Sequence, residues 1–580
     1  MKTKQIKRRD FLKSALLASG GILLAPVVTA CRNAEELLGF TPAPDGLTNK
    51  NFDFGVASFD PTANSVIIWS RYNNAAEINW EISKSSDFKD LVNAGTVNAE
   101  AAHDFSIAIE VQNLPSHSKF YYRFYNKATK DVSVVGETIT LPSKSDGANE
   151  VKLVVASCSN YPAGYFNVYK EMANSDADVI VHLGDYIYEY APGQYGTNSF
   201  TAAAGRAHKP EKELITLEDY RGRYKQYRSD KHLQLAHQKK PFICVWDDHE
   251  IANDTYVNGA QNHQANEGSF EARKAAALQA YSEFIPLKTG KDVRIYRSFD
   301  FENIISLHML DTRVIARSKQ LTYADYISAT GEFNEPLFKS HLFDRSRKLL
   351  GDEQTLWLQK QLNGSSAKWQ VLGHQVLMTK MLIPAEMFLL LARITAEAEN
   401  LGGAQPATLM AFQKTLQELL VIKARVAQKD PTLTPEEIAR VKTVLPYNLD
   451  AWDGYPMERE YLYALCLGKN VVTLAGDTHN GWCGELKDGF GNKIGKELAA
   501  SSVSSPGMEV YLGLGADPSQ AVQLAGALAM LVDDLEYANL YKRGYLYAKF
   551  TSAQVVSEWR YVDTVFSENY SVNTEKVISF

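Results

Sequence analysis

The stretch Asp178-Val-Ile-Val-His-Leu-Gly-Asp185 decides the fold, because an apolar run ends there in a carboxylate that can bind a metal ion. Its β-branched residues are typical of a buried strand. In layered α/β proteins, ligands gather beyond the carboxyl ends of the strands. The stretch therefore predicts a strand whose end carries Asp185 into a functional site.

Four more apolar runs end in residues of the same kind. They are residues 151–157 before Cys158, 241–246 before Asp247-Asp248-His249-Glu250, 369–373 before His374, and 470–476 before Asp477-Thr478-His479. One such run is weak evidence, because an Asp after a strand is often only a helix cap. Five runs in one region favour a shared site over a purely structural reading.

The order of these runs predicts a large catalytic domain. Between residues 150 and 570, strand-like runs alternate with helical stretches, which is typical of layered α/β structure. Residues 384–440 indicate a helical insertion, because Leu, Ala, Glu and Lys dominate and Thr434-Pro-Glu-Glu437 is a helix-start signal. The insertion enters shortly after His374 and returns just before Asp450, so we expect it to overhang the site as a lid.

Residues 51–142 are expected to form a small all-β domain. The runs 65–69 and 120–125 are β-branched or aromatic, and Asn, Gly, Pro and Asp separate such runs. Several short strands in a region of this length favour a sandwich of immunoglobulin or fibronectin type. Residues 31–50 are expected to be a linker.

Residues 1–30 have the pattern of an export signal. Lys7-Arg8-Arg9-Asp10-Phe11-Leu12-Lys13 places an Arg pair before an apolar stretch, which resembles a twin-arginine signal, with a membrane anchor as the alternative. Val28-Thr29-Ala30-Cys31 resembles a lipoprotein cleavage box, although a chance Cys near an ordinary cleavage site would look the same. The two patterns predict passage through the twin-arginine export machinery and a membrane tether through lipid on Cys31. The protein would then be periplasmic or on the cell surface.

Composition and charge exclude several classes of protein. Apolar residues make up 45% and charged residues 22%, so the chain is not wholly disordered, collagenous or coiled coil. Removal of residues 1–30 takes away six basic side chains and one acidic side chain, so the formal net charge falls from −7 to −12. A general nucleic-acid binder would be basic. An anionic substrate would need cations in the site to attract it.

The side chains at the strand ends suit two different cations. Two cations held close together need a shared carboxylate, and Asp185 could bridge them. A thiolate, a phenolate and an imidazole would come from Cys158, Tyr188 and His479. This set suits a transition metal, particularly ferric iron. The oxygens of Asp248 and Asp477 would suit a harder second cation such as calcium.

Several of these residues have a plainer interpretation. Cys158 could be a small buried hydrophobe. Tyr188 could serve packing, although its place three residues after Asp185 favours a ligand. Arg313 could clamp phosphate through its planar fork or pair with Asp311. Asn253 and Asp254 could add oxygen ligands on the calcium side, or they could cap or turn the chain. Asp450 and Asp453 fit a turn better than a metal site.

The motifs, taken in order, resemble those of one known family. They are Ser157-Cys158, His182-Leu-Gly-Asp-Tyr-Ile-Tyr-Glu189, Val245-Trp-Asp-Asp-His-Glu250, Asp450-Ala-Trp-Asp-Gly-Tyr-Pro456 and Ala475-Gly-Asp-Thr-His-Asn480. Supporting segments are Phe54-Gly-Val-Ala-Ser-Phe-Asp-Pro61, Ser502-Val-Ser-Ser-Pro-Gly507 and Arg543-Gly-Tyr545. Over about residues 50–565, the chain resembles the PhoD-type alkaline phosphatases.

This resemblance implies a metallophosphoesterase core, four-layered α/β/β/α, with a mixed iron–calcium centre. By position, the iron ligands would be Cys158, Asp185, Tyr188 and His479. The residues that face the calcium side would be Asp185, Asp248 and Asp477. The expected content is one ferric ion (Fe3+) and one or two calcium ions (Ca2+), with other divalent metals as alternatives.

The resemblance also implies roles near the phosphate ester. His249 follows Asp248 as the His of the superfamily's Asn-His pair does, so it would bind or protonate the ester. The family often has Asn where this chain has His374. His374 could therefore be a second-site ligand, a phosphate contact or a residue behind the ligands. The insertion at 384–440 is longer than typical, so substrate access does not carry over from the family.

We therefore expect metal-dependent hydrolysis of phosphomonoesters, and with them phosphodiesters, by a metal-activated water or hydroxide. Phosphate would be released outside the cytoplasm. One rival is a phospholipase-D-like phosphodiesterase that acts on lipid head groups, since a tether would place the site near membranes. The other rival is a surface binding lipoprotein without activity.

Overall fold

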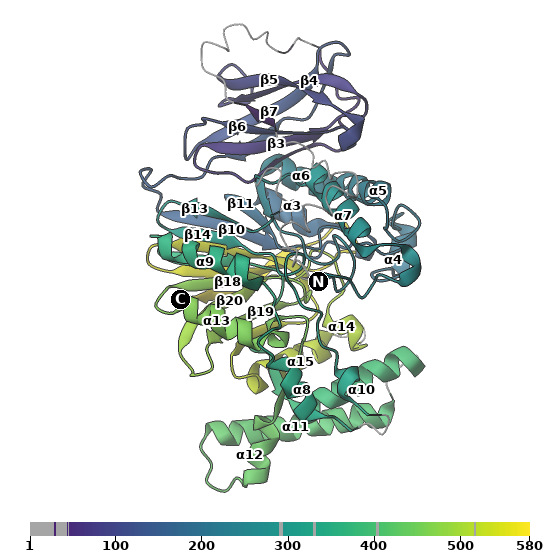
Figure 1. Cartoon of the computed structure of the whole chain (residues 1–580), viewed down its shortest axis with the longest axis vertical. Helices are drawn as coiled ribbons and strands as arrows, with labels where there is room; N and C mark the ends of the chain where they lie inside the picture. The colour runs from purple at the N-terminus through teal and green to yellow at the C-terminus, as the bar shows by residue number, and fades with distance from the viewer. Residues whose placement is uncertain are drawn as a thin grey trace, which may run out of the picture.

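Figure 1 shows the computed structural model, which describes residues 28–30, 43, 46–288, 294–328, 332–401, 405–514 and 518–580. The Arg pair of the export pattern and Cys31 lie outside these ranges, so the signal and the tether stay predictions. Val28–Ala30 form β1, which pairs in parallel with β6 (Ser106–Gln112). Within the described ranges, no helix is long and apolar enough to cross a membrane.

The fold is mixed α/β, as predicted, and a ten-stranded sheet runs through it. The strand order is β1-β6-β3-β2-β12-β11-β10-β22-β23-β24. The strands besides β1 and β6 are β2 (Val56–Phe59), β3 (Ser65–Arg71), β10 (Glu150–Ala156), β11 (Val179–His182), β12 (Pro241–Cys244), β22 (Arg543–Thr551), β23 (Val555–Val562) and β24 (Val572–Ser579).

A seven-stranded sheet packs against the first across a shared apolar core. Its strands, in spatial order, are β13 (Arg297–Phe301), β14 (Ile305–Met309), β15 (Trp369–Gly373), β18 (Val471–Ala475), β20 (Lys493–Ala499), β19 (Gly481–Lys487) and β21 (Leu535–Asn539). Val371 of β15 packs in the same core as Val154 of the first sheet, whereas Leu372 packs with Leu358 on the other side. Burial on both faces explains why β15 is almost wholly apolar.

Helices bury their apolar residues in these two cores. Helices α3, α5, α6 and α7 share the core of the ten-stranded sheet, and α9, α13 and α15 share the core beyond the seven-stranded sheet. The bounds are α3 (Asn167–Asn174), α4 (Ser199–Ala203), α5 (Leu217–Arg228), α6 (Lys231–Lys239), α7 (Phe270–Phe284), α8 (Glu335–Leu342), α9 (Gly351–Gly364), α13 (Pro456–Cys466), α14 (Met508–Tyr511) and α15 (Pro518–Leu531).

The N-terminal β region is joined to the catalytic region more closely than its sequence predicts. Its own sheet consists of β4 (Ala76–Ser83), β5 (Leu91–Ala99), β7 (Lys119–Asn126), β8 (Asp131–Val132) and β9 (Gly136–Ile139). Strands β2, β3 and β6 instead extend the ten-stranded sheet, because β2 pairs with β12. Within β3, Val66 and Ile68 face the small sheet, whereas Ile67 and Trp69 face the catalytic core.

The insertion is helical and lies at one end of the molecule. It contains α10 (Ala385–Leu401), α11 (Pro406–Ala427) and α12 (Pro435–Lys442), and Thr434 caps α12 in a capping box with Glu437. Lys423 of α11 pairs with Asp533, just after α15, at 2.5 Å. Figure 1 shows α11 and α12 at the opposite end of the long axis from β4 and β5. The lid role stays a prediction.

Candidate metal centre

Parallel pairing aligns the ends of strands that are far apart in the chain. Ala156 of β10 lies beside His182 of β11, which in turn lies beside Cys244 of β12. In the second sheet, Gly373 of β15 lies beside Leu474 of β18. Because aligned parallel strands end at the same edge, the residues that follow them gather there. These residues are Cys158, Asp185, Asp248, His374 and Asp477.

A first group of possible ligands forms around Asp185. Cys158, Asp185 and His479 are buried, and their ligand atoms all lie within 4.8 Å of one another. The Tyr188 hydroxyl donates to Asp185 Oδ2 at 2.9 Å and lies 3.2 Å from His479 Nε2. The structure therefore brings together the four residues that the resemblance assigns to iron.

A cation fits this group on chemical grounds. Asp185 Oδ1 is buried and has no hydrogen-bond partner among the described residues. Burial, together with the carboxylates of Asp248 and Asp247, raises the pKa of Asp185 well above its usual value. An unsatisfied buried polar group costs about 1–3 kcal/mol. A bound cation would remove this cost by pairing with the carboxylate.

The His479 ring is held in the orientation that ligand binding needs. Nδ1 lies 2.7 Å from the Pro506 carbonyl oxygen and 3.0 Å from the Tyr195 hydroxyl. Burial lowers the pKa of His479 to about 3, so the ring is neutral and donates its Nδ1–H to the carbonyl. Nε2, on the Tyr188 side, then carries the lone pair. A hydrogen bond of this kind fixes the tautomer of metal-binding histidines.

A second group shares Asp185 with the first. Asp185, Asp248 and His249 are buried, and their ligand atoms lie within 4.8 Å of one another. His249 Nδ1 lies 2.7 Å from Glu189 Oε2. Burial alone would lower the pKa of His249, but the carboxylates of Asp185, Asp248 and Glu189 raise it well above its usual value. His249 can therefore carry a proton beside the shared carboxylate.

Arg313 pairs with acidic residues other than Asp311. Its guanidinium lies 2.5 Å from Asp247, 2.8 Å from Asp450 and 3.2 Å from Asp477, and it is fully buried. The Asp311 carboxylate instead accepts a hydrogen bond from the Arg313 backbone N–H at 2.9 Å. The ion pair with Asp311, one of the two alternatives for Arg313, does not form, because Asp311 accepts backbone hydrogen bonds in the local turn. The phosphate clamp stays a prediction.

The oxygen-rich side holds more carboxylates than the sequence indicates. Asp248 and Asp477 lie 3.8 and 3.2 Å from the Arg313 guanidinium. Asp254 donates its backbone N–H to Asp248 at 2.6 Å, and burial beside the Asp450 carboxylate raises the pKa of Asp254 to about 7. Asp450, predicted to order a turn, therefore belongs to this cluster. Crowded carboxylates favour a bound cation, since like charges at close range oppose ionisation.

His374 lies at the expected strand end but joins neither ligand group. It is buried, and neither ring nitrogen has a hydrogen-bond partner in the part of the chain that the structure describes. Burial lowers the pKa of His374 to about 4, so the ring is neutral. The Trp452 ring meets it edge-on at 6.2 Å between centroids. The three alternatives for the role of His374 stay open.

Four of the candidate ligands have left-handed backbone conformations. The φ angle is 62° at Cys158, 55° at Asp185, 63° at Asp477 and 63° at His479. Residues with a Cβ atom rarely adopt this region, and each instance costs of order 1–3 kcal/mol. Such strain persists where the surrounding structure enforces it, and it clusters at functional sites. The backbone conformation of these four residues therefore supports their assignment to a functional site.

Sequence reasoning misses three residues that contact the candidate ligands. Glu189 holds His249, Tyr195 reaches His479, and Ser505 lies 2.7 Å from the Tyr188 hydroxyl. Glu189 and Ser505 lie within motifs of the family, so the sequence indicates their importance but not the residues that they contact. Tyr195 lies in a loop that carries no such signal.

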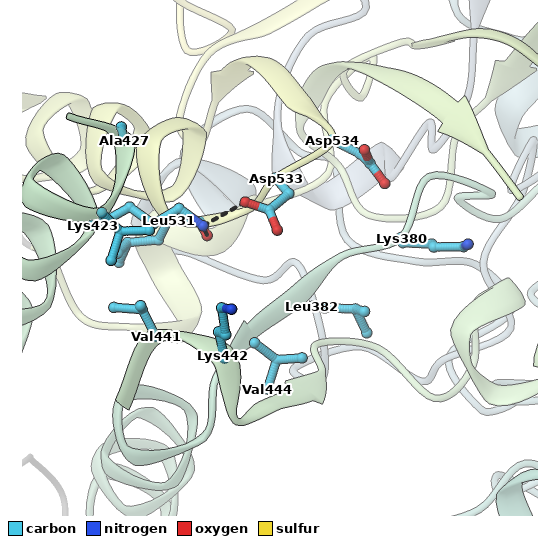
Figure 2. A pocket seen from close by; sticks show the side chains of 11 residues that line it. Lys380, Leu382, Lys423, Ala427, Val441, Lys442, Val444, Leu531, Asp533 and Asp534 are labelled. Atoms are coloured by element: carbon cyan, nitrogen blue, oxygen red, sulfur yellow. Dashed lines mark hydrogen bonds and ion pairs between the residues drawn. The ribbon is translucent and has the colours of Figure 1, made fainter. Parts of the chain in front are cut away.

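The cavity in Figure 2 lies away from this centre. It has a volume of about 560 Å³ and lies between the helical insertion and the catalytic core, where Lys423 pairs with Asp533. None of the candidate metal ligands lines it. Because the candidate ligands gather at the strand ends, we place the chemistry there and not in this cavity.

The fold and the two ligand groups define an α/β protein with residues at its strand ends that could hold metal ions. The family model described as PhoD-like phosphatase matches residues 153–559, and the model of that family's N-terminal domain matches residues 40–142. The chain belongs to the PhoD-like phosphatase family. The family inferred from the motifs is therefore confirmed.

A known protein and a solved structure resemble the chain over most of its length. Alkaline phosphatase D of Bacillus subtilis (strain 168) is 31% identical, and the match covers 98% of this chain and 86% of that protein. A solved structure described as "Structure of PhoD" has a TM-score of 0.70 and 28% identity, and covers 93% of this chain and 91% of its own. The fold and the likeness therefore extend over nearly the whole chain.

Proposed function

We propose that the chain hydrolyses phosphate esters, phosphomonoesters and with them phosphodiesters, at the buried centre around Asp185. The observation that carries this proposal is the sharing of Asp185 between a Cys158 group and an Asp248 group. Membership of the PhoD-like phosphatases and the likeness to alkaline phosphatase D support the same reaction.

The geometry supports a distinct part for each group. Cations held here would activate water and neutralise charge on the phosphoryl group. We assign ferric iron to the Cys158 side, whose thiolate, phenolate and imidazole suit a transition metal. We assign one or two calcium ions to the side of Asp248 and Asp477, where the ligand atoms are oxygens. His249, held by Glu189, would contact the ester oxygen and hold a proton for the leaving group.

The rates of product release from three substrates test this function: phosphate from a monoester, the alcohol from a diester and choline from phosphatidylcholine. Protein matured in its own host is assayed on a phosphomonoester, a simple phosphodiester and phosphatidylcholine. Fastest turnover of the monoester supports the proposal. Fastest release of choline from phosphatidylcholine would favour the phospholipase-D-like rival, and metal-loaded protein without turnover would favour the binding lipoprotein.

We also propose the finer description of the fold. Residues 150–570 would be a four-layered α/β/β/α core, which the two apolar cores on either side of the seven-stranded sheet support. Residues 51–142 would be a sandwich of immunoglobulin or fibronectin type. A core shared by Ile68 of β3 with Ile78 and Trp80 of β4 supports this.

Export and tethering give a prediction of their own. Cys31→Ala is expected to move the mature protein from the membrane fraction to the soluble fraction, because the lipid needs that thiol. Replacing Arg8 and Arg9 by Lys should keep the precursor inside the cell. Cell fractionation with immunoblotting checks both changes. Membrane-bound Cys31→Ala protein would contradict the lipid tether and favour an uncleaved anchor.

A further inference from the structure

The loop after β20 contacts three of the four residues of the Cys158 group, although the proposed function gives it no role. Ser505 Oγ lies 2.7 Å from the Tyr188 hydroxyl oxygen, and it donates to the Cys158 carbonyl oxygen at 2.9 Å. The Pro506 carbonyl oxygen lies 2.7 Å from His479 Nδ1. Ser505 itself is fully buried. The loop therefore contacts the group through hydrogen bonds that can hold its side chains in place.

We propose that Ser505 is a positioning residue that holds the Tyr188 oxygen in place as a metal ligand. This inference rests on the proposed metal centre. Ser505 has one hydroxyl proton, which goes to the Cys158 carbonyl in the structure. Tyr188 keeps its own proton and donates it to Asp185 Oδ2 at 2.9 Å. With both protons placed in this way, the Ser505 Oγ and the Tyr188 oxygen lie 2.7 Å apart with no proton between them.

A cation bound through the Tyr188 oxygen would change this oxygen from a hydrogen-bond donor into an acceptor alone. The phenol proton would then pass to solvent, and the oxygen would be a charged acceptor. Charged acceptors make shorter and stronger hydrogen bonds than neutral ones. Rotation of the Ser505 hydroxyl about its Cβ–Oγ bond supplies the missing donor, since the two oxygens are already 2.7 Å apart. One proton leaves the site and one changes partner.

The two acceptors that lose a donor in this rotation keep another partner. The Cys158 carbonyl loses the Ser505 hydroxyl but lies 3.3 Å from the backbone nitrogen of Ser505 and 3.4 Å from that of Ser504, and both N–H groups donate to it. Asp185 Oδ2 loses the Tyr188 proton, and its negative charge then faces the cation. The loop is therefore built to satisfy the Cys158 carbonyl with Ser505 turned either way.

Ser505→Ala and Ser504→Ala form a matched pair for the test. Ser504 is also buried, and its hydroxyl also donates to a backbone carbonyl, that of Asn160 at 2.8 Å. Ferric iron is titrated into metal-stripped wild type and both variants, and the dissociation constant and the visible phenolate-to-iron band are recorded. Tyr188→Phe identifies that band. Ser505→Ala is expected to bind iron about 10–100-fold more weakly with a shifted band, while Ser504→Ala matches wild type.

Three results would overturn the inference. One is an unchanged iron affinity and an unshifted band in Ser505→Ala. Another is an equal loss in Ser505→Ala and Ser504→Ala, with lowered unfolding temperatures of the metal-stripped proteins, since the loop would then serve folding alone. The third is a wild type without a phenolate band. Phosphate release is measured separately, so an active enzyme with any of these results leaves the proposed hydrolysis of phosphate esters intact.

Discussion

Asp185→Asn is expected to remove activity on an alkyl phosphate and on nitrophenyl phosphate alike, and to lower the metal content on both sides of the centre. Asp185 belongs to both ligand groups, so a neutral amide takes away the charge that they share. We expect a loss larger than the roughly 10–100-fold typical of a change behind the ligands. Steady-state rates and metal analysis of one preparation measure it.

Asp311→Asn is the matched control for this variant. Asp311 is buried, burial raises its pKa, and its Oδ2 has no hydrogen-bond partner among the residues described, as is true of Asp185 Oδ1. It belongs to neither ligand group, so its variant should keep metals and rates. Metal-stripped Asp185→Asn should unfold no earlier than wild type, because it has one carboxylate fewer in a crowded cluster. Wild-type metal content in Asp185→Asn would contradict the shared role.

His249→Ala is expected to slow the hydrolysis of alkyl phosphates by about 10²–10⁴-fold and that of nitrophenyl phosphate far less. An alkoxide needs a proton to leave, whereas nitrophenolate leaves readily without one. Glu189 holds His249 Nδ1 at 2.7 Å, and the surrounding carboxylates keep its pKa well above the usual value, so the ring can supply that proton. The ratio of kcat/KM for the two substrates measures the effect.

Metal content separates this role from a ligand role. The His249 ligand atom lies within 4.8 Å of those of Asp185 and Asp248, close enough to share a cation with them. If His249→Ala keeps its metals and loses mainly alkyl phosphate activity, the ring serves the leaving group. Loss of metal together with equal losses on both substrates would contradict the acid role and make His249 a ligand.

The strand ends could be predicted because each signal is local. Every apolar run ends directly in a residue with ligand chemistry, and parallel strands of one sheet end at one edge. Contacts between candidate ligand residues that are far apart in the chain have no such local signal. Tyr188 and His479 are 291 positions apart, yet their polar atoms lie 3.2 Å apart. Only the known order of the family's motifs connects such residues from sequence.

The choice of partners by charged residues could not be predicted. Arg313 has Asp311 two positions away, but backbone N–H groups already engage that carboxylate, so the guanidinium pairs with Asp247 and Asp450. The packing of β3 between the small sheet and the catalytic core is indicated more clearly by the sequence. The run 66–69 is apolar without alternation, which is typical of a strand buried on both faces. That pattern indicates that β3 packs on two layers.

The metal content of active protein matured in its own host tests the central claim most directly. The claim is that one buried centre combines a thiolate–phenolate–imidazole side with an oxygen side around Asp185. We expect one iron and one or two calcium ions per chain, in coloured protein that releases phosphate from a monoester. Colourless protein that is equally active and contains only zinc, or no metal, would contradict the account.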